Sequence, residues 1–271
     1  PRVLVLFFYI KREKPDVVHL FWGHYPALIG YLVKEYCHDV KLTMFLGAYD
    51  LECNYGGSGY VAKISEVVWT HCRANVKKII KLSVKPKNIK VSYRGVDLTK
   101  IKNISINKQS CLIISAGTLD ASKRMNLVLK VFQSLIQNIP AARLIILGDG
   151  HERTNLENLS VKYSINDYVD FKGHVAHDIV FNELAQAKIF LFLSNKPSER
   201  LPNVVKEAMA VGCVCVVNQT VGIEELIIHN ENGYIINPDN IDQTVQVISK
   251  IFRSKELFSE ISNNARKHIY K

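Results

Sequence analysis

Short runs of β-branched and aliphatic residues alternate with amphipathic stretches at a regular interval from residue 108 to the end of the chain. Such runs, separated by helix-length segments, are typical of a parallel sheet wrapped by helices. The predicted strands are residues 111–115, 143–147, 168–171, 189–193, 213–217 and 234–236. The predicted helices are residues 123–137, 151–163, 178–186, 202–211 and 223–229, with two more after residue 241. We therefore predict one doubly wound, Rossmann-like domain over residues 108–271.

The first hundred residues show the same alternation less completely. Predicted strands cover residues 17–20, 41–45, 67–70 and 89–93, and predicted helices cover residues 26–36 and 74–82. Residues 2–14 have the aromatic and β-branched content of a strand, but the following Pro15-Asp16 break and the basic end favour a helix, which we predict. Residues 101–109, rich in Asn, Ser and Lys, are the predicted linker. The fold class is thus α/β, with Rossmann-like domains at residues 1–100 and 108–271.

The longest apolar run gives no sign of a membrane span. Val3 to Ile10 is far shorter than the roughly 20 residues that a membrane-spanning helix needs. It follows Pro1, lacks a small-residue cleavage site and is flanked by basic residues, so it does not resemble a signal peptide. We therefore expect a cytoplasmic protein whose sequence here starts inside a longer chain.

Charge narrows the class of partner. The net charge of +10 and the pI near 9.2 favour anionic partners such as phosphorylated substrates or an acidic membrane face. The lysines are dispersed, and neither an aromatic-interleaved basic stretch nor a helix-turn-helix signature is present, so nucleic acid is not expected. The six cysteines form no C-x-x-C pair and several lie in apolar runs. They predict buried, reduced thiols and no metal site.

The strongest candidate site is the segment from Ser198 to Gly212. A predicted strand ends just before it, Pro202 suits the first turn of a helix, and Gly212 suits the helix end. The amino end of this helix should therefore lie at the carboxyl edge of the sheet, where free N–H groups can bind a diphosphate. Glu199 and Glu207 flank that turn and can accept hydrogen bonds from sugar hydroxyls. Without these neighbours, both would be ordinary surface carboxylates.

A second candidate segment runs from Ser115 to Lys123. It joins the first strand of the second domain to its first helix, and Lys123 should open that helix. The ammonium group of Lys123 can meet a phosphate there, although taken alone Lys123 would be a solvated lysine. Gly117 and Thr118 lie in the same turn.

These segments together resemble family 4 of the retaining glycosyltransferases, which have the GT-B fold. Glu199, seven intervening residues and Glu207, followed by Ala-Met-Ala-x-Gly, resemble the E-x7-E segment of that family. The turn with Lys123 is similar to the G-R-L-x-x-x-K phosphate clamp, except that Thr118 replaces arginine and removes a bidentate phosphate donor. Arg124 is a candidate to compensate for it.

Weaker similarities extend along nearly the whole chain. Residues 147–150 resemble the strand-ending G-D-G, whose null interpretation is a simple turn, and residues 91–97 resemble the interdomain P-N-G-V-D with Arg94 for asparagine. Residues 171–175 are similar to the F-x-G-x-V segment beside the nucleotide base. Residues 16–19 resemble the D-V-V-H strand of the first domain, but Phe21 replaces a second histidine, for which His24 is the candidate substitute. Residues 45–50 resemble F-H-G-x-D, with Leu46 for histidine.

The resemblance implies transfer of a sugar from a nucleotide-sugar donor to a glycan or lipid-linked acceptor, with retention and with no metal or cofactor. It implies a role in cell-surface polysaccharide synthesis at the cytoplasmic face of the inner membrane, with possible peripheral contact with acidic lipid. It also implies that the first domain is incomplete, because the first strand and glycine-rich loop of the family would precede residue 1, and that both ends are truncated. The implied catalytic residues are Glu199 and His24. The implied donor-binding residues are Lys123, Glu207, Gly117, Thr118, Arg124, Leu201, Asn203, Val204, Gly173 and His174.

Two other functions stay open at this point. The departures at Thr118, Phe21 and Leu46 would also suit a module that binds a nucleotide sugar without turnover. A sugar-nucleotide epimerase of the GT-B fold would act on the donor with no acceptor.

Overall fold

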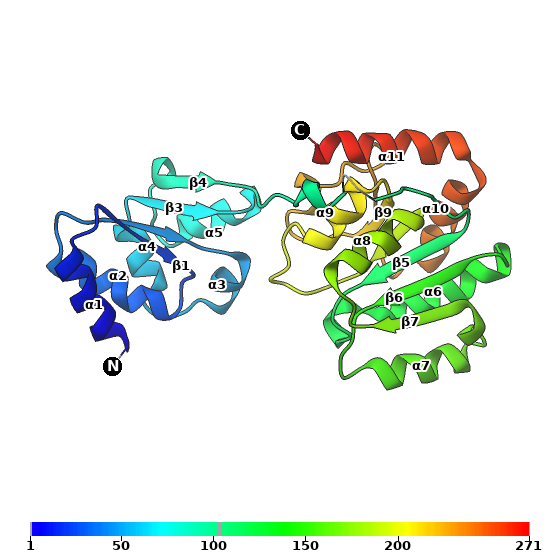
Figure 1. Ribbon diagram of the computed structural model, residues 1–271, viewed down its shortest axis with the longest axis horizontal. Coiled ribbons are helices and arrows are strands. Elements are labelled where there is room, and N and C mark those ends of the chain that lie inside the picture. Colours follow the sequence, from blue (N-terminus) through cyan, green and yellow to red (C-terminus); the bar gives the residue numbers. More distant parts are fainter. Residues whose placement is uncertain (1, 102–103, 271) are drawn as a thin grey trace. The chain divides into compact units, whose positions relative to one another are not determined.

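The computed structural model describes residues 2–101 and 104–270, and its chain divides into two compact units (Figure 1). The first unit runs to Gly95 and includes Pro197–Arg200, and the second unit begins at Val96. Residues 102 and 103 of the predicted linker lie outside the described residues.

The first unit is built on a parallel sheet in the order β1-β2-β3-β4. Its strands are β1 (Val17–Phe21), β2 (Lys41–Phe45), β3 (Val67–Thr70) and β4 (Ile89–Val91). Its helices are α1 (Arg2–Glu13), α2 (Tyr25–Tyr36), α3 (Ala48–Cys53), α4 (Ser58–Ile64) and α5 (Val76–Lys81). The helix predicted at the amino end is confirmed as α1. The core contains Val33, Leu42, Met44, Val68 and Ile79 from both helices and strands.

The sequence pattern missed α3 and α4, which are only one to two turns long. A polar side chain rather than an apolar repeat fixes α3. The buried carboxylate of Asp50 accepts hydrogen bonds from the backbone N–H of Gly47 (2.9 Å) and of Gly23 (2.7 Å). Asp50 thus caps α3 and joins it to the loop after β1.

The second unit contains a six-stranded sheet in the order β10-β9-β8-β5-β6-β7, with every neighbouring pair parallel. Its strands are β5 (Leu112–Ala116), β6 (Arg143–Leu147), β7 (Val169–Gly173), β8 (Ile189–Phe192), β9 (Val214–Asn218) and β10 (Tyr234–Ile236). All six predicted strands are confirmed, with ends that differ by at most two residues. The strand order reverses between β5 and β8, which is where doubly wound sheets bind ligands.

Helices cover this sheet on either side (Figure 1). They are α6 (Met125–Asn138), α7 (Arg153–Lys162), α8 (His177–Gln186), α9 (Asn203–Ala210), α10 (Ile241–Arg253) and α11 (Lys255–Ile269). Helix α6 packs between α7 and α10, while α9 packs between α8 and α11. Strands β8 and β9 are buried at every position, as expected for central strands of a parallel sheet. No helix in the described part of the chain is long and apolar enough to cross a membrane.

The helix predicted at residues 223–229 is wrong. Only a single 3-10 turn, Ile223–Glu225, forms after Gly222, whose φ is +86°. The following backbone is satisfied by a side chain instead of by helical hydrogen bonds. Buried Asn232 accepts from the N–H of Ile228 (2.7 Å) and donates to the carbonyl of Leu226 (3.2 Å).

Candidate functional site

A cavity of about 530 Å³ opens at the carboxyl edge of the second sheet. Its walls come from the loops after β5, β6 and β7, the first turns of α8, and helix α9. The lining residues are Ala116, Gly117, Thr118, Lys123, Leu147, Gly148, Asp149, His174, Val175, Ala176, His177, Val180, Val204 and Glu207. Six of the predicted donor-binding residues are among them, from four segments far apart in the sequence.

Backbone hydrogen bonds lock the three strand-ending loops together. The N–H of Gly117 donates to the carbonyl of Leu147 (3.0 Å), and the N–H of Gly148 donates to the carbonyl of Gly173 (2.8 Å). Gly148 has φ +127°, and a Cβ atom there would lie 1.9 Å from the carbonyl oxygen of Gly117. Glycine is therefore required for this close approach. The glycines of the G-D-G stretch thus build one wall of the cavity.

Lys123 reaches the cavity from a 3-10 turn, Ala121–Lys123, and not from the start of a helix as predicted. Arg124 takes a left-handed conformation with φ +51°, so α6 begins only at Met125. Asp120 caps the turn by accepting from the N–H of Ser122 (2.8 Å) and from its hydroxyl (2.5 Å). The hydrogen bond from the Ser122 side chain is the main reason why the pKa of Asp120 lies below its ordinary value.

The Lys123 side chain lies along Gly117. A Cβ atom on Gly117 would be 3.3 Å from both Cδ and Cε of Lys123. The ammonium nitrogen lies 5.2 Å from the ring centroid of Phe192, at the end of β8, in a cation–π arrangement. The missing side chain of Gly117 and the ring of Phe192 therefore direct the cation to the cavity edge.

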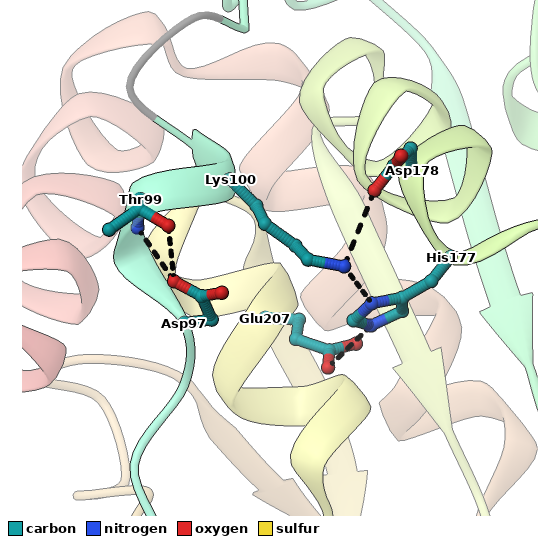
Figure 2. A network of polar contacts seen from close by, with 6 residues as sticks. All are labelled: Asp97, Thr99, Lys100, His177, Asp178 and Glu207. Atoms are coloured by element: carbon teal, nitrogen blue, oxygen red, sulfur yellow. Dashed lines mark hydrogen bonds and ion pairs between the residues drawn. The ribbon is translucent and has the colours of Figure 1, made fainter.

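Glu207 stands on the opposite wall, in the second turn of α9. Its side chain is only 11% exposed, and its Oε1 lies 3.0 Å from Nε2 of His177. His177 is the first residue of α8, and its side chain is 49% exposed. Figure 2 shows this pair together with Lys100, whose Nζ lies 3.4 Å from Nδ1 of the same ring. Sequence reasoning missed His177, because no local signal distinguishes it from a solvated histidine.

The amino end of α9 faces the same cavity through Val204. Pro202 is the N-cap rather than the first helical residue, as had been predicted, and it leaves no N–H of its own to satisfy. The side-chain oxygen of Asn203 accepts from Lys206 (3.1 Å), and Leu201 is buried with φ +47°. Neither Leu201 nor Asn203 is among the described residues that line the cavity.

Two more predicted donor-binding residues lie outside the cavity wall. Arg124 forms an ion pair with Asp239 (3.0 Å). Gly173 is buried behind the lining and has φ +71°. A Cβ atom on Gly173 would lie 2.8 Å from the guanidinium of Arg153, which also donates to the carbonyl of Phe171 (3.1 Å). Gly173 therefore shapes the loop and does not itself line the cavity.

The two predicted catalytic residues belong to the first unit. Glu199 lies in Pro197–Arg200, the segment grouped with that unit. His24 is the N-cap of α2, where its Nδ1 accepts from the N–H of Tyr25 (2.8 Å). His24 also lines a second cavity, of about 890 Å³, whose wall contains five tyrosines: Tyr25, Tyr31, Tyr49, Tyr55 and Tyr60.

The cysteines differ from the prediction of uniformly buried thiols. Cys72, Cys213 and Cys215 are buried, whereas Cys53 is exposed and Cys37 and Cys111 are half-buried. Burial raises the pKa of the Cys213 and Cys215 thiols, which keeps them protonated. In the described residues, no three His, Cys, Asp or Glu side chains cluster closely enough to hold a metal ion.

Comparison with known proteins places this geometry in a family. Over 264 residues the chain is 32% identical to an uncharacterized glycosyltransferase of Haemophilus influenzae, covering 97% of this chain and 68% of that protein. It is 25% identical to N-acetyl-alpha-D-glucosaminyl L-malate synthase of Bacillus anthracis, covering 96% of this chain and 71% of that protein.

The fold is that of GT-B glycosyltransferase structures. The crystal structure of Anabaena HepE in complex with UDP aligns with a TM-score of 0.79 at 16% identity, covering 98% of this chain and 76% of that one. The sequence model of the family described as "Glycosyl transferases group 1" matches residues 97–268, which contain the whole cavity lining. The chain therefore belongs to the group 1 glycosyl transferases.

Proposed function

We propose that this glycosyltransferase takes a sugar from a nucleotide-sugar donor, held in the cavity of the second unit, and transfers it with retention to a glycan or lipid-linked acceptor. One observation carries the proposal. The cavity at the carboxyl edge of the sheet has an ammonium group, Lys123, on one wall and a carboxylate, Glu207, on the other. Its volume of about 530 Å³ is in the range of small-molecule sites. A cation and a carboxylate in one cavity suit a ligand that carries both a diphosphate and free hydroxyls.

Each wall has a distinct task in this proposal. The ammonium of Lys123 and the amino end of α9 stabilise the negative charge that collects on the departing diphosphate. The carboxylate of Glu207 accepts hydrogen bonds from hydroxyl groups of the ribose. Glu199 orients the donor sugar and His24 serves on the acceptor side, as the family resemblance implies. Retention, the sugar and the acceptor class likewise come from that resemblance.

The donor site is tested by nucleotide binding. UDP is the probe, because HepE was crystallised with it. We expect Lys123→Ala to weaken UDP binding by about 10- to 100-fold in calorimetry, because a hydrogen bond to a charged group contributes about 1.5–3 kcal/mol. Lys130→Ala is the matched control, since Lys130 is exposed on α6 outside the cavity lining. Equal affinities for the two variants would contradict the proposed site.

Transfer is tested separately from binding. Incubation of a radiolabelled nucleotide sugar with glycan, lipid-linked and small-acid acceptors should give a product whose anomeric configuration, measured by NMR, equals that of the donor. Binding without product would favour a donor-binding module, and conversion of the donor with no acceptor would favour an epimerase. The opposite anomer would contradict retention. We also propose that no metal or cofactor takes part, so a chelator should leave the transfer rate unchanged.

We further propose that the protein is cytoplasmic and works at the inner membrane face, in synthesis of cell-surface polysaccharide. The net charge of +10 supports contact with acidic lipid. Vesicles with anionic lipid should sediment the protein at low salt, and high salt should release it, because exposed charges are screened. No difference between anionic and neutral vesicles would contradict this part of the proposal.

A further inference from the structure

Glu207 does not stand alone in the cavity wall. Figure 2 shows a chain of side chains that begins in the Leu98–Ile101 turn, crosses the first residue of α8 and ends on α9. Nζ of Lys100 lies 3.4 Å from Nδ1 of His177, and Nε2 of His177 lies 3.0 Å from Oε1 of Glu207. All three residues belong to the second unit. His177 and Glu207 both line the cavity, so the chain ends at the position where a ligand would meet the carboxylate.

The donors and acceptors in this chain have one consistent order. A lysine ammonium only donates, so Nδ1 of His177 must accept from Lys100. The remaining hydrogen of the neutral ring is then on Nε2, which donates to Oε1 of Glu207. An ionised carboxylate only accepts, so Oε2 of Glu207 keeps its capacity to accept from a ligand. The order thus gives the two carboxylate oxygens different partners, one from the protein and one from the ligand.

The start of the chain is itself held in place. Asp97 accepts from the N–H of Thr99 (3.0 Å) and from its hydroxyl (2.6 Å), which fixes the turn that carries Lys100. Hydrogen bonding by Thr99 lowers the pKa of Asp97. The 3.5 Å contact of Lys100 with Asp178 is weak, since the Asp178 side chain is 81% exposed. The contact of Lys100 with His177 is also long, so its main effect is on the tautomer of the ring.

We propose that His177 is a positioning residue for donor recognition, which makes the site select nucleotides with free ribose hydroxyls. The Nε2–H group holds Glu207 in one rotamer, with Oε2 directed to the cavity. A glutamate without this hydrogen bond has more rotamers, and the ligand would have to order it on binding. This inference rests on the proposed function, because it takes Glu207 as the acceptor of the ribose hydroxyls.

The test compares two probes, UDP and 2′,3′-dideoxy-UDP, by calorimetry on the full chain. The unchanged protein should bind UDP more tightly than the dideoxy probe. We expect His177→Ala to weaken UDP binding by about 10-fold while changing the affinity for the dideoxy probe by less than 2-fold, which reduces the ratio of the two. His177→Gln, whose amide can still donate, should restore part of that ratio. His151→Ala is the control, because His151 is 72% exposed and lies outside the described cavity lining.

A double-variant cycle shows whether His177 acts through Glu207. Glu207→Gln should lower the UDP to dideoxy-UDP ratio, and adding His177→Ala to it should cause no further loss of UDP affinity. Equal weakening of both probes by His177→Ala, or additive losses in the double variant, would overturn the inference. If Glu207→Gln alone kept the full ratio, the proposed role of Glu207 would fail, and the inference with it. A thermal unfolding curve for each variant distinguishes these outcomes from a loss of folding.

Discussion

Gly148→Ala should destabilise the second unit more than any exposed substitution in it. The Cβ atom of an alanine would lie 1.9 Å from the carbonyl oxygen of Gly117, about 1.5 Å closer than the 3.4 Å of an ordinary contact. The opposing atom is backbone, so no side chain can move aside. The two loops must separate, or the backbone must leave φ +127°.

The cost can be worked from the contacts that separation would break. The loops share the hydrogen bonds Gly117 N–H to Leu147 (3.0 Å) and Leu119 N–H to Asp149 (2.9 Å). Each is worth about 1 kcal/mol net. A backbone conformation that alanine rarely adopts costs about 1–3 kcal/mol more. The sum is about 3–5 kcal/mol, at the severe end for single substitutions.

The assay is differential scanning calorimetry of the full chain. For a unit of this size, about 1 kcal/mol lowers Tm by roughly 2–4 °C, so the transition of the second unit should fall by roughly 10 °C. UDP binding should weaken as well, because the displaced loops line the cavity. Gly56→Ala is the matched control, since a Cβ atom there would meet nothing within 4 Å. A Tm change below roughly 2 °C for Gly148→Ala would refute the reasoning.

Two further predictions concern acid stability. Hydrogen bonding by Ser122 lowers the pKa of Asp120, so its stabilisation is complete above the ordinary value of 3.8 and is lost as the pH falls through the lower folded-state value. Asp120→Ala should therefore cost about 1 kcal/mol in urea unfolding at neutral pH and less in strong acid; an equal cost at both would contradict this. Burial raises the pKa of Glu66, but hydrogen bonds from Lys34 and from the N–H of Leu42 outweigh it and lower the pKa. Glu66→Gln should cost only about 0.5 kcal/mol above pH 4.5, because the side chain is 40% exposed, and a cost that grows as the pH falls would contradict the sign.

The sheets could be predicted from the sequence because their strands lie between two layers of helices. Strands such as β8 and β9 are buried on both faces, so they appear as continuous apolar runs whatever their neighbours. The elements that prediction missed or misplaced depend on single polar contacts instead. Asp50 holds α3, and Asn232 replaces the helix expected at residues 223–229. Such contacts have no period in the sequence.

The candidate site was predictable only where one short segment contains its own signal. Gly117, Lys123 and Glu207 lie in stretches whose order of glycine, proline and charged residues indicates a strand, a turn and a helix start. His177 has no such signal. Its importance comes from a contact with Glu207, 30 positions later in the chain, which exists only after α8 and α9 have packed together. Pairings of this kind require coordinates.

The substitution of Thr118 for arginine gains meaning from the same coordinates. Among the described residues that line the cavity, Lys123 is the only lysine or arginine. Arg124, the candidate to compensate, instead pairs with Asp239. A diphosphate in this cavity would therefore meet one ammonium group and the amino end of α9, where a site with arginine at position 118 would add a bidentate donor. Recognition must then depend more on the hydroxyl groups of the ligand, and hence on how firmly Glu207 is held.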